Sequence, residues 1–173
     1  MPIVPTLGAR EIRFILRQSA SVMVVVPRVF RGVDYPALLA RLRPDAPSVR
    51  DVVVLDNDGI PARLLGAAGA ADLGVDPGAV ATVLYTSGTT ADPKGARHSH
   101  RTLAIEADAT IAYHRLGDDE VFVMPSPVSH ISGLLYGVLL PIVLGATSVL
   151  MERWEPERFL DLVERERDRK SVV

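Results

Sequence analysis

Short runs of apolar, mostly β-branched residues with no polar alternation place the strongest limit on the fold. Three such runs are Val22 to Val26, which ends at Pro27, Val52 to Leu55, and Val80 to Tyr85. Strands that are apolar throughout are typical of sheets with both faces covered, and such sheets are mostly parallel. The runs therefore predict buried strands in an α/β fold rather than an antiparallel sheet with one wet face.

Segments with helical spacing alternate with these runs. Ala9 to Ser19 places Ile12, Ile15 and Leu16 on one side of a helix. This alternation predicts a layered, mostly parallel sheet with helices on both faces. The other predicted helices are Tyr35 to Leu42, Ser99 to Leu116 (Leu103, Ala104, Ala107 and Ile111 on one face, Gly117 at the end), Leu134 to Leu144 and Pro156 to Arg169 (Phe159, Leu160 and Val163 inside). The other predicted strands are Val121 to Met124 and Ala146 to Met151. Residues 56–78 are predicted to form a loop that opens with a turn at Asp56 to Gly59, with one short helix as the alternative for part of it.

Composition excludes several classes of function. The formal net charge is -2, which gives no electrostatic case for binding nucleic acid. The chain has no cysteine, so disulfides, thiol catalysis and Cys–zinc sites are excluded, and a cytoplasmic location is expected. His98 and His100 lie two residues apart at a predicted helix start and would point to different sides, which is unsuited to one metal ion. We therefore assign no metal ligands.

The apolar segment from Gly133 to Leu150 raises the alternative of a membrane-spanning helix, which needs about 20 predominantly apolar residues. Gly137, Pro141 and Gly145 interrupt this segment. A buried helix that leads into a buried strand accounts for these interruptions, so we expect no membrane span.

The segment Thr86 to Gly95 has the chemistry of a phosphate-binding loop for ATP. A strand that ends in a glycine-containing loop before a helix can direct backbone N–H groups at an anion. Lys94 adds a mobile positive charge suited to the β- and γ-phosphates, and Pro93 limits the freedom of the loop. The alternative is a surface loop rich in Ser, Thr and Gly. The candidate nucleotide-binding residues are Thr86, Ser87, Gly88, Thr89, Thr90, Lys94 and Gly95, and the four hydroxyls among them suit phosphate oxygens or a magnesium ion.

The stretch from Tyr85 to His100, YTSGTTADPKGARHSH, resembles the signature of the adenylate-forming superfamily. That superfamily includes acyl-CoA synthetases, luciferases and the adenylation domains of peptide synthetases. Ala91 stands where the usual pattern has Gly, a change expected to stiffen the loop without abolishing binding. Pro2 to Asp56 resembles the substrate–CoA ligases of fatty, cycloaliphatic or related carboxylic acids. The resemblance implies that such an acid is activated by ATP and Mg²⁺ to acyl-AMP and is then transferred to coenzyme A as acyl-CoA.

The stretch from Pro125 to Gly133 resembles the second signature of the same superfamily, a Pro-rich turn with a histidine. In the family this region lines the pocket of the carboxylate substrate. The resemblance implies that His130 lies beside the reacting acyl group and that Gly133 leaves room for it. The alternative is a buried histidine whose ring bonds a backbone carbonyl.

We expect residues 1–173 to be part of the large N-terminal domain of an adenylate-forming enzyme, without the rest of that domain and without the lid domain. Nothing after Pro156 resembles the family's Thr-Glu pair for magnesium, and Lys170 matches no family motif. The catalytic set is therefore expected to be incomplete, so that this chain would not complete the reaction alone. A catalytically silent nucleotide-binding remnant and a peptide-synthetase adenylation domain are the alternatives.

Overall fold

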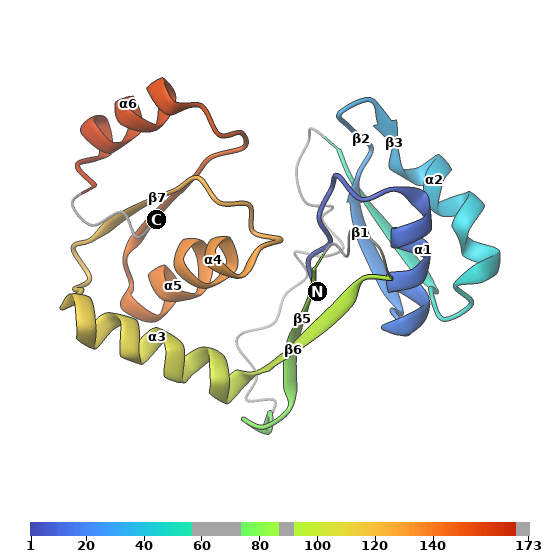
Figure 1. The fold of residues 1–173 in the computed structure, drawn as a ribbon, viewed down its shortest axis with the longest axis horizontal. Coiled ribbons are helices and arrows are strands. Elements are labelled where there is room, and N and C mark those ends of the chain that lie inside the picture. Colours follow the sequence, from blue (N-terminus) through green and yellow to red (C-terminus); the bar gives the residue numbers. More distant parts are fainter. Residues whose placement is uncertain (57–73, 87–91, 169–173) are drawn as a thin grey trace. The chain divides into compact units, whose positions relative to one another are not determined.

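The computed structural model describes residues 1–56, 74–86 and 92–168, and these divide into two compact units (Figure 1). The N-terminal unit comprises Pro5–Val75 and Tyr85–Lys94. The C-terminal unit comprises Met1–Val4, Asp76–Leu84 and Gly95–Val173. Each unit is mixed α/β, with helices beside a parallel pair of strands. The predicted fold class is therefore confirmed.

The N-terminal unit is built on the parallel pair β1 (Met23–Pro27) and β4 (Asp51–Leu55), with Met23 opposite Asp51. Burial of β1 differs from the prediction. Val26 is buried, but Met23 and Val25 are each about half exposed (50% and 51%). Successive side chains of a strand point to opposite faces. The face of β1 that bears Met23 and Val25 is therefore only partly covered by the described residues, and the continuous apolar run does not indicate full burial of the strand.

Two helices pack in the N-terminal unit beside β1 (Figure 1). The helix α1 (Ala9–Gln18) buries the predicted stripe of Ile12, Ile15 and Leu16. The helix α2 (Tyr35–Leu42) has the predicted bounds, and the carboxylate of Asp34 caps it by accepting from the Ala37 N–H at 2.9 Å. A short 3₁₀ turn, η1 (Arg43–Asp45), follows it.

A small hairpin precedes α2 and was not predicted. Its strands, β2 (Val29–Phe30) and β3 (Val33–Asp34), pair antiparallel. Arg31 and Gly32 form the connection, with φ angles of 51° and 78°. Two successive positive φ values are the geometry of the tight turns that match the twist of paired strands.

The C-terminal unit is built on the parallel pair β7 (Val121–Met124) and β8 (Thr147–Leu150), both at predicted positions. A continuous helical segment joins them: α4 (Ile131–Leu134), one π-helical turn η3 (Leu135–Leu139), and α5 (Leu140–Leu144). It begins three residues before the predicted helix and ends at Gly145, whose φ is 72°. The core of this unit contains Phe122, Leu135, Leu140, Ala107 and Leu116.

Two further helices complete the unit, and both differ in detail from prediction. The helix α3 (His100–His114) is capped by Ser99 and ends at Arg115, whose left-handed φ of 54° replaces the predicted stop at Gly117. On it Ala107 is buried but Ala104 is exposed. The helix α6 (Pro156–Glu166) buries Leu162, whereas Leu160, predicted to lie inside, is 65% exposed.

Two strands flank the predicted phosphate loop. The strand β5 (Val80–Thr86) agrees with prediction, but β6 (Lys94–Ser99), its hydrogen-bonded neighbour, was not predicted. The predicted loop over residues 56–78 and its turn lie largely outside the described residues. Within the described part of the chain, no helix has the length and apolar character needed to cross a membrane. The segment 133–150 forms the helix, turn and strand described above.

Candidate functional site

The predicted phosphate loop runs from the end of one strand to the start of the next. Thr86 is the last residue of β5, and Lys94 and Gly95 are the first two residues of β6. A helix does follow the loop, as predicted, but the unpredicted strand β6 lies between them, and α3 begins at His100. Any phosphate bound here would therefore be held by the loop itself, without a helix N-terminus at Lys94. Four of the predicted residues, Ser87, Gly88, Thr89 and Thr90, lie outside the described residues.

The two ends of the loop meet at Thr86 and Lys94, which we call the neck of the loop. The hydroxyl of Thr86 donates to the backbone carbonyl of Lys94 at 3.5 Å. Pro93 is buried, whereas Lys94 is exposed and has no ion-pair partner among the described residues. The exposed ammonium of Lys94 is a donor suited to phosphate oxygens, whereas the Thr86 hydroxyl in this arrangement donates to the Lys94 carbonyl. Binding of a nucleotide polyphosphate by these residues stays a prediction.

Helix α1 contacts the chain on both sides of this neck. The phenol of Tyr85 donates to Oε1 of Gln18 at 2.8 Å, and Nη2 of Arg10 lies 3.4 Å from Oδ1 of Asp92. Burial raises the pKa of Tyr85, which keeps the phenol protonated as a donor. These contacts join residues 67 and 82 positions apart, and no local sequence signal indicated them.

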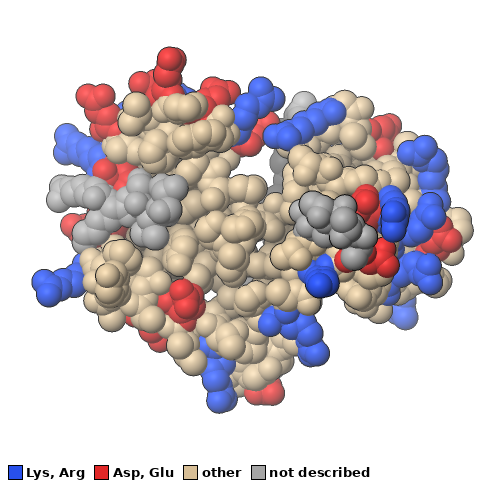
Figure 2. Space-filling view, in the orientation of Figure 1, with Lys and Arg blue, Asp and Glu red and all other residues tan. Residues whose placement is uncertain are grey.

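The exposed face of α1 carries Arg10, Arg13 and Arg17, of which Arg10 pairs with Asp92 and Arg13 pairs with Asp45. A hollow lies along it and is lined by Arg10, Arg13, Phe14, Arg17, Gln18 and Asp92. On the face shown in Figure 2, Lys and Arg side chains are spread over the N-terminal unit, whereas Asp and Glu predominate over α6. The described end of the loop, at Asp92, therefore adjoins an arginine-rich surface.

The second predicted motif forms a turn that enters helix α4. His130 occupies the N-cap position, and its ring accepts from the Ser132 N–H at 3.4 Å. Its Nδ1 also lies 2.8 Å from the hydroxyl of Ser132, which in turn lies 3.2 Å from the hydroxyl of Ser126. His130 is exposed, so the alternative of a buried ring bonded to a carbonyl is wrong. Its Nδ1 is engaged, which leaves Nε2 as the ring atom available to a ligand.

Gly133 is buried on α4 because the turn packs directly against it. A Cβ atom at this position would lie 2.2 Å from the carbonyl oxygen of Pro127 and 2.6 Å from that of Ser126. The backbone of the turn thus fills the space beside Gly133, which gives the glycine a packing role of its own. Room for an acyl group at Gly133 stays a prediction. The hydroxyl of Ser129, in the same turn, is buried without a hydrogen-bond partner in the described structure.

The structure thus brings together two local groups of predicted residues. Thr86 and Lys94 meet in the N-terminal unit, and in the C-terminal unit His130 caps the start of α4 while Gly133 lies in its first turn. Among the described residues, no cluster of three His, Asp or Glu side chains is arranged to hold a metal ion. Arg10 and Gln18 are the contacts of the loop that sequence reasoning missed.

A mixed α/β fold in which a strand leads into a loop rich in Ser, Thr and Gly is typical of nucleotide-binding proteins. The particular family is that of the AMP-binding enzymes: its family model matches residues 1–169, and the chain belongs to it. The medium-chain fatty-acid–CoA ligase of Escherichia coli is 29% identical over 181 residues, covering 96% of this chain and 31% of the relative. The salicyl-AMP ligase / salicyl-S-ArCP synthetase of Mycobacterium tuberculosis is 32% identical over 168 residues, covering 93% and 30%.

Solved structures show the same fold. The ATP-bound MatB of Rhodopseudomonas palustris superposes with a TM-score of 0.81 at 24% identity, over 95% of this chain and 32% of that one. The inhibitor-bound N-terminal domain of FACL13 from Mycobacterium tuberculosis gives 0.78 at 26% identity, over 96% and 41%. This chain therefore spans about a third of the length of the curated relatives it matches.

Proposed function

We propose that this chain binds MgATP at the loop between β5 and β6 and contributes to the site that activates a carboxylic acid. The observation that carries the proposal is the neck of the loop, where Thr86 contacts the backbone of Lys94 and the Lys94 ammonium is exposed without an ion pair to any described residue. Asp92, two residues before Lys94, lines the hollow along the arginine-bearing face of α1. The family match over residues 1–169 supports it, since the neck lies inside the matched region. The overall reaction proposed is the conversion of the acid to acyl-AMP and then to acyl-CoA.

The chemistry requires two negatively charged groups to approach. A carboxylate oxygen attacks the α-phosphorus of ATP, the bond to the β-phosphate oxygen breaks, and pyrophosphate leaves. The thiol of coenzyme A then attacks the acyl carbon, loses its proton, and AMP leaves. Lys94 offsets the charge of the phosphates as the carboxylate approaches. Magnesium, when bound, supplies further neutralising charge, and the hydroxyls of Thr86, Ser87, Thr89 and Thr90 are the candidates to reach it or the phosphates.

For the acid we propose a fatty or cycloaliphatic chain, bound beside His130 and Gly133. The similarity to a medium-chain fatty-acid–CoA ligase supports this class. The exposed Nε2 edge of His130 offers a polar contact for the carboxyl end, because Nδ1 is held by Ser132. We further propose a cytoplasmic location.

The reaction is tested by exchange of labelled pyrophosphate into ATP, with a panel of fatty, cycloaliphatic, aromatic and amino acids. We expect exchange that depends on a fatty or cycloaliphatic acid and that is lost in Lys94→Ala. Exchange with amino acids alone would favour a peptide-synthetase adenylation domain. If MgATP binds but no acid supports exchange, the activation proposal is wrong for this chain.

The second candidate is a nucleotide-binding module without catalysis. The observation that favours it is local: Thr86 and Lys94, the described candidates for phosphate binding, meet within the N-terminal unit. It predicts MgATP binding that Lys94→Ala weakens, together with no pyrophosphate exchange. The same two assays therefore separate the two candidates.

A further inference from the structure

One helix holds the chain on both sides of the phosphate loop. Gln18, the last residue of α1, accepts from the buried Tyr85 just before Thr86, and Arg10, near its first turn, pairs with Asp92 just before Pro93 and Lys94. Three inward residues, Ile12, Ile15 and Leu16, fix α1 in the core of the N-terminal unit at no more than 6% exposure. The chain on both sides of the loop thus contacts one helix that is anchored in the core.

The two tethers act on the residues that carry the phosphate chemistry. On one side the Tyr85–Gln18 hydrogen bond immediately precedes Thr86, and Tyr85 is 8% exposed. On the other, the Arg10–Asp92 pair is exposed, but Asp92 is joined to Lys94 through the buried Pro93, whose ring removes backbone freedom. A restraint on Asp92 therefore passes to Lys94 through one stiff residue.

We propose that Arg10 and Gln18 are positioning residues, which hold Lys94 and Thr86 in the arrangement that receives the phosphates of ATP without touching the nucleotide themselves. This inference rests on the proposed function of the loop. Because Thr86 and Lys94 are positioned before ATP arrives, less conformational entropy is lost on binding.

A positioning role and a purely electrostatic role predict opposite changes in MgATP affinity for the variant Asp92→Asn. Arg10→Gln removes a positive charge near the phosphates, and Asp92→Asn removes a negative charge. If charge acted only through space, Arg10→Gln would weaken MgATP binding and Asp92→Asn would strengthen it. If the pair acts as a tether, both substitutions weaken binding. The double variant then binds no more weakly than either single variant, since the tether is lost only once.

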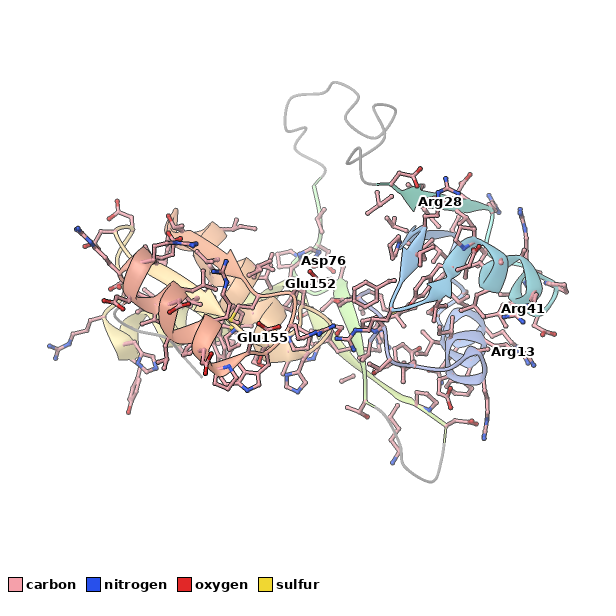
Figure 3. All side chains as sticks on the ribbon, turned by 90° about the horizontal axis from the view of Figure 1, so that it is seen from above. Arg13, Arg28, Arg41, Asp76, Glu152 and Glu155 are labelled. Atoms are coloured by element: carbon pink, nitrogen blue, oxygen red, sulfur yellow. The ribbon has the colours of Figure 1, made fainter. Side chains whose placement is uncertain are left out.

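The experiment is calorimetric titration of MgATP into the unmodified chain, the two single variants, the double variant and Arg41→Gln. Arg41 is the matched control, because it projects from α2 on the same unit and has no ion pair within the described structure (Figure 3). We expect a two- to five-fold rise in Kd, the size typical of an exposed ion pair, for Arg10→Gln and for Asp92→Asn, and no change for Arg41→Gln. Tighter binding by Asp92→Asn, or additive losses in the double variant, would overturn the tether.

Backbone hydrogen exchange measured without nucleotide tests the positioning role independently of ATP binding. In Arg10→Gln and Gln18→Ala we expect faster exchange of the backbone amides of Thr86 and Lys94, and unchanged exchange in Arg41→Gln. If the unmodified chain does not bind MgATP, the proposed function fails, while faster exchange still supports positioning by α1. Unchanged exchange in both Arg10→Gln and Gln18→Ala would contradict the positioning role, whatever the result with ATP.

Discussion

The carboxylate of Asp168 accepts a hydrogen bond from the backbone N–H of Val123 at 2.9 Å, across 45 residues of sequence. The hydrogen bonds from Thr147 N to Glu120 O and from Met151 N to Met124 O show which side of β7 faces β8. In a parallel ladder the groups of alternate residues face opposite sides, so the Val123 N–H points away from β8. Asp168 therefore satisfies a buried donor on the other edge of the strand.

Replacing Asp168 tests this contact. We expect Asp168→Ala to lower the free energy of unfolding by about 1–3 kcal/mol, because it removes the acceptor of a buried N–H. Asp168→Asn retains an acceptor oxygen and should cost less. Denaturant titration measures both, with Asp161→Ala, an exposed aspartate on α6, as the control. Equal stabilities of Asp168→Ala and Asp161→Ala would show that the edge contact contributes nothing.

Gly133 gives a second prediction about the turn of the candidate acyl site. An alanine Cβ would overlap the carbonyl oxygens of Pro127 and Ser126, which are backbone atoms and move only with the turn. We expect Gly133→Ala to destabilise the chain by about 1–3 kcal/mol. Gly78→Ala, whose nearest neighbour is the side chain of Asp76 at 3.4 Å, is the control and should be close to neutral. A neutral Gly133→Ala would mean that the turn is not packed as described.

Truncation to alanine should have very different effects on stability at two leucines of α6. Leu162 is 5% exposed, so Leu162→Ala is expected to cost about 2–5 kcal/mol through lost burial and the cavity left behind. Leu160 is 65% exposed, and Leu160→Ala should stay within about 0.5 kcal/mol of the unmodified chain. Thermal or denaturant unfolding of the pair checks this. Comparable losses for both would place the buried face of α6 elsewhere.

The pair formed by Arg28 and Asp56 predicts a pH dependence in the acid range. Nε of Arg28 lies 2.6 Å from Oδ1 of Asp56, and Nη2 lies 3.0 Å from Oδ2, at the labelled Arg28 in Figure 3. The hydrogen bond from Arg28, with its charge, lowers the pKa of Asp56 below its ordinary value of 3.8. The folded pKa lies below the unfolded one, so the contribution to stability is present above pH 3.8 and is lost as the pH falls through the folded pKa.

Carbon-detected NMR titration of the Asp56 carboxyl measures this shift directly. We expect a midpoint below 3.8 in the unmodified chain and a return toward 3.8 in Arg28→Gln. Arg41→Gln is again the control and should leave the Asp56 midpoint where it is. The same midpoint in all three proteins would contradict the ion pair.

Local patterns predicted most of the elements, because the residues that define them are close in sequence. The stripe of Ile12, Ile15 and Leu16 gave α1, and the leucines of Tyr35–Leu42, followed by Pro44, gave α2 with its observed bounds. Leu160 was misassigned because helical spacing alone does not say which side of an amphipathic helix meets the core. On α6 the neighbouring Leu162 takes that place.

The missed features depend on contacts that sequence periodicity does not record. The strand β6, which reads KGARHS, has no apolar pattern and is a strand because it pairs with β5. In the same way, the Arg10–Asp92 and Tyr85–Gln18 contacts join distant segments and have no local signal. The loop motif thus indicated the chemistry, while the way in which its ends are held became clear only from the fold.

The proposed nucleotide site is tested most directly by MgATP protection of lysine. The chain contains only two lysines, Lys94 and Lys170, so amine-selective labelling followed by peptide mass spectrometry reports each one separately. We predict that saturating MgATP protects Lys94 but not Lys170, and that Lys94→Ala weakens MgATP binding whereas Lys170→Ala does not. Equal labelling of Lys94 with and without MgATP, together with unchanged affinity in Lys94→Ala, would contradict the phosphate-binding role of this loop.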